Sequence, residues 1–149
     1  MKIEGTFPGQ EQAALLIEAA STAAQQAYAP YSGFRVGAAL LLKDGTVVTG
    51  TNIENASYGL TLCAERSAVA RAVSEHGPAM RIHAIAVTNL NSAASAPCGA
   101  CRQVLAEFAA PDAWIAFPFG DKLEIRPFAD LLPFPFGLSD EATRKETRR

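Results

Sequence analysis

Three cysteines are the residues of this chain whose types and spacing point most directly to chemistry. Cys98 and Cys101 stand three residues apart in "PCGAC", and Cys63 lies in "TLCAERSAVARA", residues 61–72. An odd number of thiols cannot pair off completely as disulfides, and three fall one short of the four that close a structural zinc site. Three protein ligands fit a catalytic zinc, whose fourth tetrahedral position stays open for water.

Glu65 stands two residues after Cys63, in the first turn of a predicted helix. That spacing turns its carboxyl group away from the metal-binding sulfur but keeps it near the metal, where it is suited to carrying a proton for the water. Cys-Ala-Glu followed by Pro-Cys-x-x-Cys is typical of zinc nucleobase deaminases, in which three cysteines can hold the metal and the glutamate does acid/base work.

Two other chemistries remain open for these residues. Cys98 and Cys101 could form a thiol redox pair, with Cys63 incidental to it. Alternatively, zinc could stabilise a noncatalytic module, with Glu65 only complementing the dipole of its helix. Metal content separates the first alternative from a deaminase, and the activity of a Glu65→Gln variant separates the second.

The elements that must position these residues alternate between strands and helices. Helices are predicted over residues 11–29, from Cys63 to Gly77 and from Cys98 to about residue 109, and strands in "FRVGAALLLKDGTVVTGTN" (two, joined at Asp44-Gly45), "RIHAIAVTN", "AWIAFPFG" and "KLEIRPF". This order predicts an α/β fold of three layers, α/β/α, with a mixed, mostly parallel five-stranded sheet and an antiparallel hairpin at one side. Both cysteine-bearing helices follow strands, so we expect them to begin at the same sheet edge.

Length and charge narrow the class of protein. The 149 residues suit a single domain over residues 1–149, in which we expect residues 138–149 to be a flexible or helical tail ending in "RKETRR". A net charge of -2 without a basic stripe argues against nucleic acid as a partner.

No segment approaches the roughly 20 apolar residues of a membrane span. The few cysteines and the lack of a signal-like start predict a cytoplasmic protein.

Four segments make the chain similar to the small, three-cysteine cytidine deaminases. They are "YSGFRVGAAL" at 31–40, "NIENASYGLTLCAER" at 52–66, "PCGACRQ" at 97–103 and "LLPFPFG" at 131–137. The resemblance implies one Zn²⁺ per chain on Cys63, Cys98 and Cys101, with Glu65 as the proton carrier. It also implies hydrolysis of cytidine and deoxycytidine to uridine and deoxyuridine with release of ammonia, in pyrimidine salvage. The main rival within the deaminases acts on another aminopyrimidine nucleoside, such as blasticidin S.

The same resemblance implies roles around the substrate. Asn52 and Glu54 match the pair that hydrogen-bonds the ribose hydroxyl, and a carboxylate there favours a free pyrimidine nucleoside over a nucleotide. Phe34 matches the phenylalanine that packs against the pyrimidine ring, and Arg66 matches an arginine that hydrogen-bonds a cysteine sulfur.

Assembly is implied as well, because members of this family are typically homotetramers. Ala56, Tyr58 and Phe136 resemble positions that reach the site of a neighbouring subunit. Phe134 and Pro135 depart from the smaller residues expected there, and the surrounding segment is too rich in proline for a helix and too apolar to leave in water.

Overall fold

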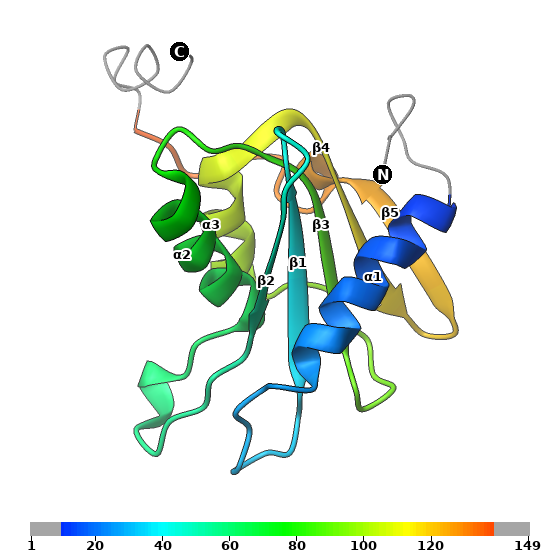
Figure 1. Ribbon diagram of the computed structural model, residues 1–149, viewed down its shortest axis with the longest axis vertical. Helices are drawn as coiled ribbons and strands as arrows, with labels where there is room; N and C mark the ends of the chain where they lie inside the picture. Colours follow the sequence, from blue (N-terminus) through cyan, green and yellow to red (C-terminus); the bar gives the residue numbers. More distant parts are fainter. Residues whose placement is uncertain (1–9, 139–149) are drawn as a thin grey trace.

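A five-stranded sheet lies between two layers of helices in the computed structural model, which describes residues 10–138 (Figure 1). The helices are α1 (Gln10–Ala24), α2 (Ala64–His76) and α3 (Gly99–Phe108), and the strands are β1 (Val36–Leu42), β2 (Val47–Thr51), β3 (Ile82–Asn89), β4 (Ala109–Phe119) and β5 (Lys122–Pro127). Helix α1 covers one face of the sheet, and α2 and α3 cover the other. The predicted three-layer α/β/α arrangement is confirmed.

The sheet has the strand order β2-β1-β3-β4-β5. Strand β1 is antiparallel to both β2 and β3, β4 is parallel to β3, and β5 is antiparallel to β4. The sheet is therefore mixed, as predicted, but the expectation that it is mostly parallel was wrong. Strands β2, β3 and β4 do run in one direction, as right-handed crossovers through α2 and α3 require. The hairpin partner β1, however, is inserted between β2 and β3.

Two glycines let the helices approach the sheet closely from opposite sides. A methyl group at Gly50 of β2 would lie 2.7 Å from the carbonyl oxygen of Ala64 in α2. A methyl group at Gly37 of β1 would lie 2.7 Å from the backbone nitrogen of Ala24 in α1. Because real side chains do not tolerate such distances, glycine at these positions fixes how near each helix comes.

Apolar residues on alternating sides of the strands build the two cores. Leu40 of β1 and Ile85 of β3 are fully buried on the side of α2 and α3, whereas Leu16 of α1 packs on the opposite side around Trp114 of β4. Covering on both faces explains why the central strands are almost continuously hydrophobic rather than alternating with polar residues.

Helix α1 ends five residues earlier than the sequence predicts. After Ala24 the chain tightens into turns, with Gln26 N donating to Ala23 O at 2.9 Å, and Tyr28 then pairs with Ile53 in an isolated bridge. Pro30 also disfavours a helical conformation at the residue before it. Residues 25–35 therefore form a loop before β1 instead of continuing the helix.

Three connecting segments gather at one end of the sheet, the lower end in Figure 1. They are residues 25–35 before β1, residues 52–63 before α2 and residues 90–98 before α3. Because α2 and α3 follow strands that run in the same direction, both helices begin at this end, as predicted.

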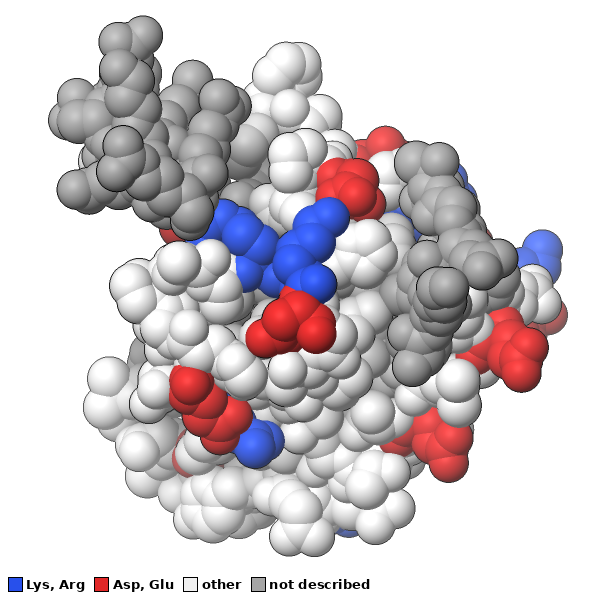
Figure 2. Space-filling model, turned by 45° about the horizontal axis from the view of Figure 1, so that its top comes forward, with Lys and Arg blue, Asp and Glu red and all other residues white. Residues whose placement is uncertain are grey.

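The surface carries charges of both signs. Basic and acidic side chains are interspersed on the face in Figure 2, in which the upper end of Figure 1 comes forward. Within residues 10–138, none of the helices combines the length and the apolar character needed to cross a membrane. The predicted tail lies outside the described residues from position 139 onward.

Candidate metal centre and pocket

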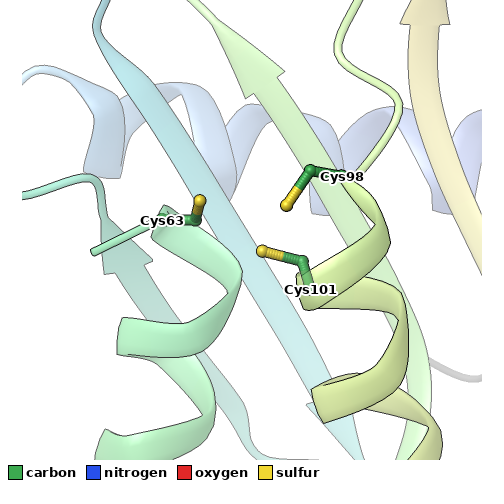
Figure 3. A group of neighbouring side chains, drawn as sticks. All are labelled: Cys63, Cys98 and Cys101. Carbon is green, nitrogen blue, oxygen red and sulfur yellow. The ribbon is translucent and has the colours of Figure 1, made fainter. Parts of the chain in front are cut away.

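The three cysteines meet between the N-termini of α2 and α3 (Figure 3). Cys63 is the residue before α2, Cys98 the residue before α3, and Cys101 lies in the first turn of α3. Their sulfur atoms all lie within 4.8 Å of one another, and none is in a disulfide. The sequence prediction that two neighbouring helix starts would bring these thiols together is confirmed.

The arrangement fits a zinc ion by its chemistry and its dimensions. A tetrahedral zinc with zinc–sulfur bonds of about 2.3 Å separates its sulfurs by roughly 3.8 Å, which is compatible with three sulfurs that all lie within 4.8 Å of one another. Two helix N-termini direct unpaired backbone N–H groups and positive dipole ends at the cluster, which stabilises thiolates. Cys101 is buried, Cys63 is half-buried and Cys98 is exposed, so the cluster is open on one side.

Arg66 in the first turn of α2 approaches the cluster. Its Nη2 lies 3.6 Å from Cys63 Sγ and 3.4 Å from Thr61 O. A hydrogen bond from the Cys101 thiol, followed by the effects of Arg66, lowers the pKa of Cys63 to about 5 despite partial burial. Donating that bond raises the pKa of Cys101. Buried Arg66 Nε has no hydrogen-bond partner among residues 10–138.

Glu65 points its carboxyl group into the same region from the first turn of α2. The residue is only 4% exposed and lines the pocket next to the cysteines. Burial raises the pKa of the Glu65 carboxyl, and the negative charge of Cys63 raises it further. A carboxyl group whose pKa moves toward neutrality is suited to both accepting and returning a proton.

A cavity of about 240 Å³ opens beside the cluster. It is lined by Phe34, Val36, Asn52, Thr61, Leu62, Cys63, Ala64, Glu65, Val87, Ala94, Ser95, Ala96 and Cys98. The structure therefore brings Phe34 and Asn52 into one pocket with Glu65 and two of the predicted metal ligands, Cys63 and Cys98, whereas the third, Cys101, is fully buried and does not line it. Its size suits one pyrimidine ring with part of an attached sugar.

Asn52 and Glu54 hold the loop that carries Phe34. Asn52 Oδ1 accepts a hydrogen bond from Val36 N at 2.8 Å, and Asn52 Nδ2 donates to Phe34 O at 2.7 Å. Glu54 Oε2 accepts from Tyr31 N at 2.9 Å and from Ser32 N at 3.2 Å, while Glu54 Oε1 accepts from Ser32 Oγ. The bond from the Ser32 hydroxyl is the main reason that the pKa of Glu54 is lowered. Glu54 itself is not among the lining residues.

Three other predicted residues lie away from this pocket. Ala56, Tyr58 and Phe136 are exposed, with Tyr58 90% and Phe136 72% accessible. The position of Phe136 is nevertheless defined, because Gln103 Nε2 donates to Phe136 O at 2.9 Å and Gln103 Oε1 accepts from Phe136 N at 3.1 Å. Gln103 lies in α3, close to the cysteine pair.

The sequence analysis did not identify several of the residues that line the pocket. Thr61 and Leu62 directly precede Cys63, and residues 94–96 directly precede Pro97 and Cys98. Their place in the chain next to metal-ligand candidates is the signal that could have identified them. Val87 is an ordinary buried strand residue, and its sequence context carries no such signal.

Comparison with protein families identifies the region that carries this site. Residues 10–117 match the family model described as the cytidine and deoxycytidylate deaminase zinc-binding region. A protein named cytidine deaminase from Halalkalibacterium halodurans is 49% identical over 128 residues, covering 85% of this chain and 95% of its own length. Its namesake from Mycobacterium tuberculosis is 48% identical over 121 residues, covering 81% and 86% respectively.

Solved structures agree with the sequence comparison. The crystal structure of cytidine deaminase from Mycobacterium tuberculosis superposes with a TM-score of 0.74 at 46% identity, covering 84% of this chain and 97% of that one. The cytidine deaminase from Burkholderia pseudomallei gives a TM-score of 0.74 at 45% identity, covering 83% and 98%. The structural similarity thus extends over more than four fifths of this chain.

Proposed function

Because this chain belongs to the family of the cytidine and deoxycytidylate deaminase zinc-binding region, we propose that it is a zinc-dependent hydrolase acting on cytidine and deoxycytidine. The products are uridine or deoxyuridine and ammonia, as in pyrimidine salvage. The observation that carries this proposal is a cluster of three thiols, two of which line one pocket together with a buried glutamate.

Cys63, Cys98 and Cys101 would hold one zinc ion per chain. When bound, zinc supplies the Lewis acid that makes a water molecule a usable nucleophile near neutral pH. Three thiolates give the ion more negative charge than a set of neutral ligands would. Arg66, which donates to Cys63 Sγ, and the two helix N-termini draw part of that charge away from the sulfurs.

Glu65 is the proton carrier of the proposed reaction. Its carboxylate accepts one proton from the attacking water and delivers it to the pyrimidine ring nitrogen. It then accepts the second proton from the added hydroxyl group and delivers that proton to the leaving amine. The raised pKa of this buried group lets it perform both halves of the transfer at one pH. Water adds to the ring carbon that carries the amino group, the carbon–nitrogen bond breaks, and ammonia leaves.

Two pocket residues, and Glu54, which holds the loop before Phe34, favour a free nucleoside. Phe34 offers a ring face to the pyrimidine, and Asn52 keeps a second N–H on its amide nitrogen for a sugar hydroxyl. Glu54 has roughly four acceptor positions, of which three hold residues 31 and 32, so one remains for the ribose. Its negative charge would repel a phosphate, which favours nucleosides over nucleotides.

We also propose that the protein works in the cytoplasm as a homotetramer. Tyr58 and Phe136 are too exposed for large aromatic residues without a partner surface, and together with Ala56 they would reach the site of a neighbouring subunit. Three unpaired thiols are compatible with a reducing compartment. Sedimentation equilibrium should give four chains per particle, and Phe136→Ala should weaken both the assembly and the activity.

A substrate comparison tests the proposed activity. Ammonia release from cytidine, deoxycytidine and blasticidin S should be measured at equal enzyme concentration. Turnover of the first two supports the assignment. Turnover of blasticidin S alone would instead establish the alternative, a deaminase of another aminopyrimidine nucleoside.

Glu65→Gln tests the role of the carboxylate, and Glu75→Gln on the same helix is its matched control. We expect the Glu65 variant to retain one zinc per chain but to lose at least about 100-fold in kcat, the lower range for a positioned acid/base group. Glu75 is exposed and pairs with Arg71, so its variant should be fully active. Full activity of Glu65→Gln would favour a noncatalytic zinc module, and a metal-free dithiol that cycles to a disulfide would favour an oxidoreductase.

A further inference from the structure

Phe34 lies in a loop, yet the backbone around it is held by side chains from the same loop and from distant parts of the sequence. Ser32 Oγ accepts a hydrogen bond from Phe34 N at 3.0 Å, and Asn52 Nδ2 donates to Phe34 O. Glu54 in turn holds Ser32. These contacts account for the two peptide groups of Phe34 itself and for one side of its loop.

The side chain of Asn91 holds the loop on the other side of Phe34. Its Oδ1 accepts a hydrogen bond from Arg35 N at 3.0 Å, and its Nδ2 donates to Gly33 O at 3.2 Å. One amide group thus bridges the two residues that flank Phe34. Gly33 has a φ of 69°, in the left-handed region, so the chain turns sharply immediately before the aromatic residue. The direction in which the Phe34 ring points therefore depends on how its neighbours are held.

Asn91 is itself fixed in place by Asn89. Asn89 Oδ1 accepts hydrogen bonds from Asn91 N at 2.8 Å and from Ala93 N at 3.2 Å, and its Nδ2 donates to Ala93 O at 2.8 Å and to Ser95 Oγ. Leu90 N also donates to Arg35 O at 3.0 Å, which continues the pairing of β1 with β3. The loop presents Asn91 as a preorganised group rather than as a mobile surface side chain.

The same loop forms one wall of the pocket. Residues 94–96 line the same cavity as Phe34, and the loop then continues through Pro97 to Cys98. The two loops lie at the lower end of Figure 1 and are joined by the Asn91 amide. Asn91 consequently ties the wall that leads to the metal ligands to the segment that carries the aromatic ring.

We propose that Asn91 is a positioning residue that sets the place of the Phe34 ring in the pocket and thereby the affinity for the pyrimidine. This inference rests on the proposed function, because it assigns Phe34 to substrate binding. Asn91 touches neither the substrate region nor the metal ligands directly. It acts only through residues 33 and 35, so its removal should affect binding of the ground state and leave the chemical step intact.

The test is a double-mutant cycle between Asn91→Ala and Phe34→Ala, with cytidine as substrate. Loss of two hydrogen bonds at an exposed site should raise KM about tenfold in Asn91→Ala, with kcat within about twofold of wild type and with unchanged zinc content. In the Phe34→Ala background the same substitution should have no further effect. Ser92→Ala, the next residue of the same exposed loop, serves as the control and should keep the wild-type KM.

The outcomes separate this inference from the function on which it rests. If the wild-type protein does not deaminate cytidine, both the proposed function and the positioning role of Asn91 are refuted. If the wild type is active but Asn91→Ala leaves KM unchanged, only the positioning role is refuted. The same holds if Asn91→Ala raises KM equally in the wild-type and Phe34→Ala backgrounds. Should Asn91→Ala not fold, Asn91→Asp answers the same question, because it keeps the acceptor for Arg35 N and loses the donor to Gly33 O; it too must raise KM.

Discussion

Gly50 determines how close α2 lies to the sheet, and α2 begins directly after Cys63 and carries Glu65 in its first turn. In Gly50→Ala the added methyl group would lie 2.7 Å from Ala64 O and closer still to Ala68 N. Ordinary contact begins at 3.4 Å, so the helix must move away by about 1 Å. The hydroxyl of Ser67 also clashes and could rotate away, but Ala64 O and Ala68 N belong to the backbone of α2, so no side-chain rotation relieves their contacts.

The displacement has a thermodynamic and a catalytic consequence. Overpacking of this kind costs about 1 to 3 kcal/mol of the free energy of unfolding. For a protein of this size, each kcal/mol lowers Tm by about 2 to 4 °C. A shift of about 1 Å in a catalytic group can also reduce the rate by about 100-fold. Gly50→Ala should therefore show a lower Tm, weaker zinc retention and a much lower kcat.

Gly37→Ala is the matched control for this prediction. It introduces the same methyl group into the sheet, but the clash is with α1, which carries none of the proposed site residues. Thermal unfolding, zinc content and kcat per folded molecule should be measured for both variants. We expect both to be destabilised and only Gly50→Ala to lose zinc and kcat. Equal losses of kcat in the two variants would refute the argument that the position of α2 governs the site.

Two further predictions concern side chains near the metal and the sugar. Arg66→Ala removes the hydrogen bond to Cys63 Sγ and should weaken zinc binding by about 10- to 100-fold in a chelator competition, whereas Arg71→Ala on the same helix should not. Hydrogen bonds from Ser32 lower the pKa of Glu54 below its ordinary 4.5. The ionised carboxylate therefore contributes its full stabilisation of the folded protein above pH 4.5, and this contribution is lost only as the pH falls through the lowered pKa. The increase in KM caused by Glu54→Gln should thus be the same from about pH 5 to 8, and a KM ratio that approaches one near pH 6 would contradict this.

The sequence predicted the metal cluster well because its determinants are local. Cys63 and Cys98 each stand at a helix start that a preceding strand and a change of hydrophobic period make recognisable, and helices following strands of one direction begin at one edge. Glu65 could be identified by its spacing from Cys63. The insertion of β1 between β2 and β3 was missed because crossovers fix strand direction but do not determine which strands are neighbours.

Residues that act through tertiary contacts were much less predictable. Asn91 reaches Gly33 and Arg35 across 58 and 56 positions of the sequence, and only the β1–β3 pairing brings these loops together. Its own loop, rich in Ser, Ala and Asn, is an ordinary connection by composition. Phe136 is recognisable as an apolar residue in an irregular segment, but its contact with Gln103 depends on how the chain returns to α3.

The central claim is that three thiols hold one zinc ion whose presence makes the pocket a cytidine deaminase site. The most direct measurement removes the metal with a chelator, returns zinc stepwise and follows ammonia release from cytidine in the same sample. Activity should be absent in the metal-free protein, rise linearly with added zinc and level off at one equivalent per chain. Full activity without zinc, or a plateau at a different stoichiometry, would contradict the account.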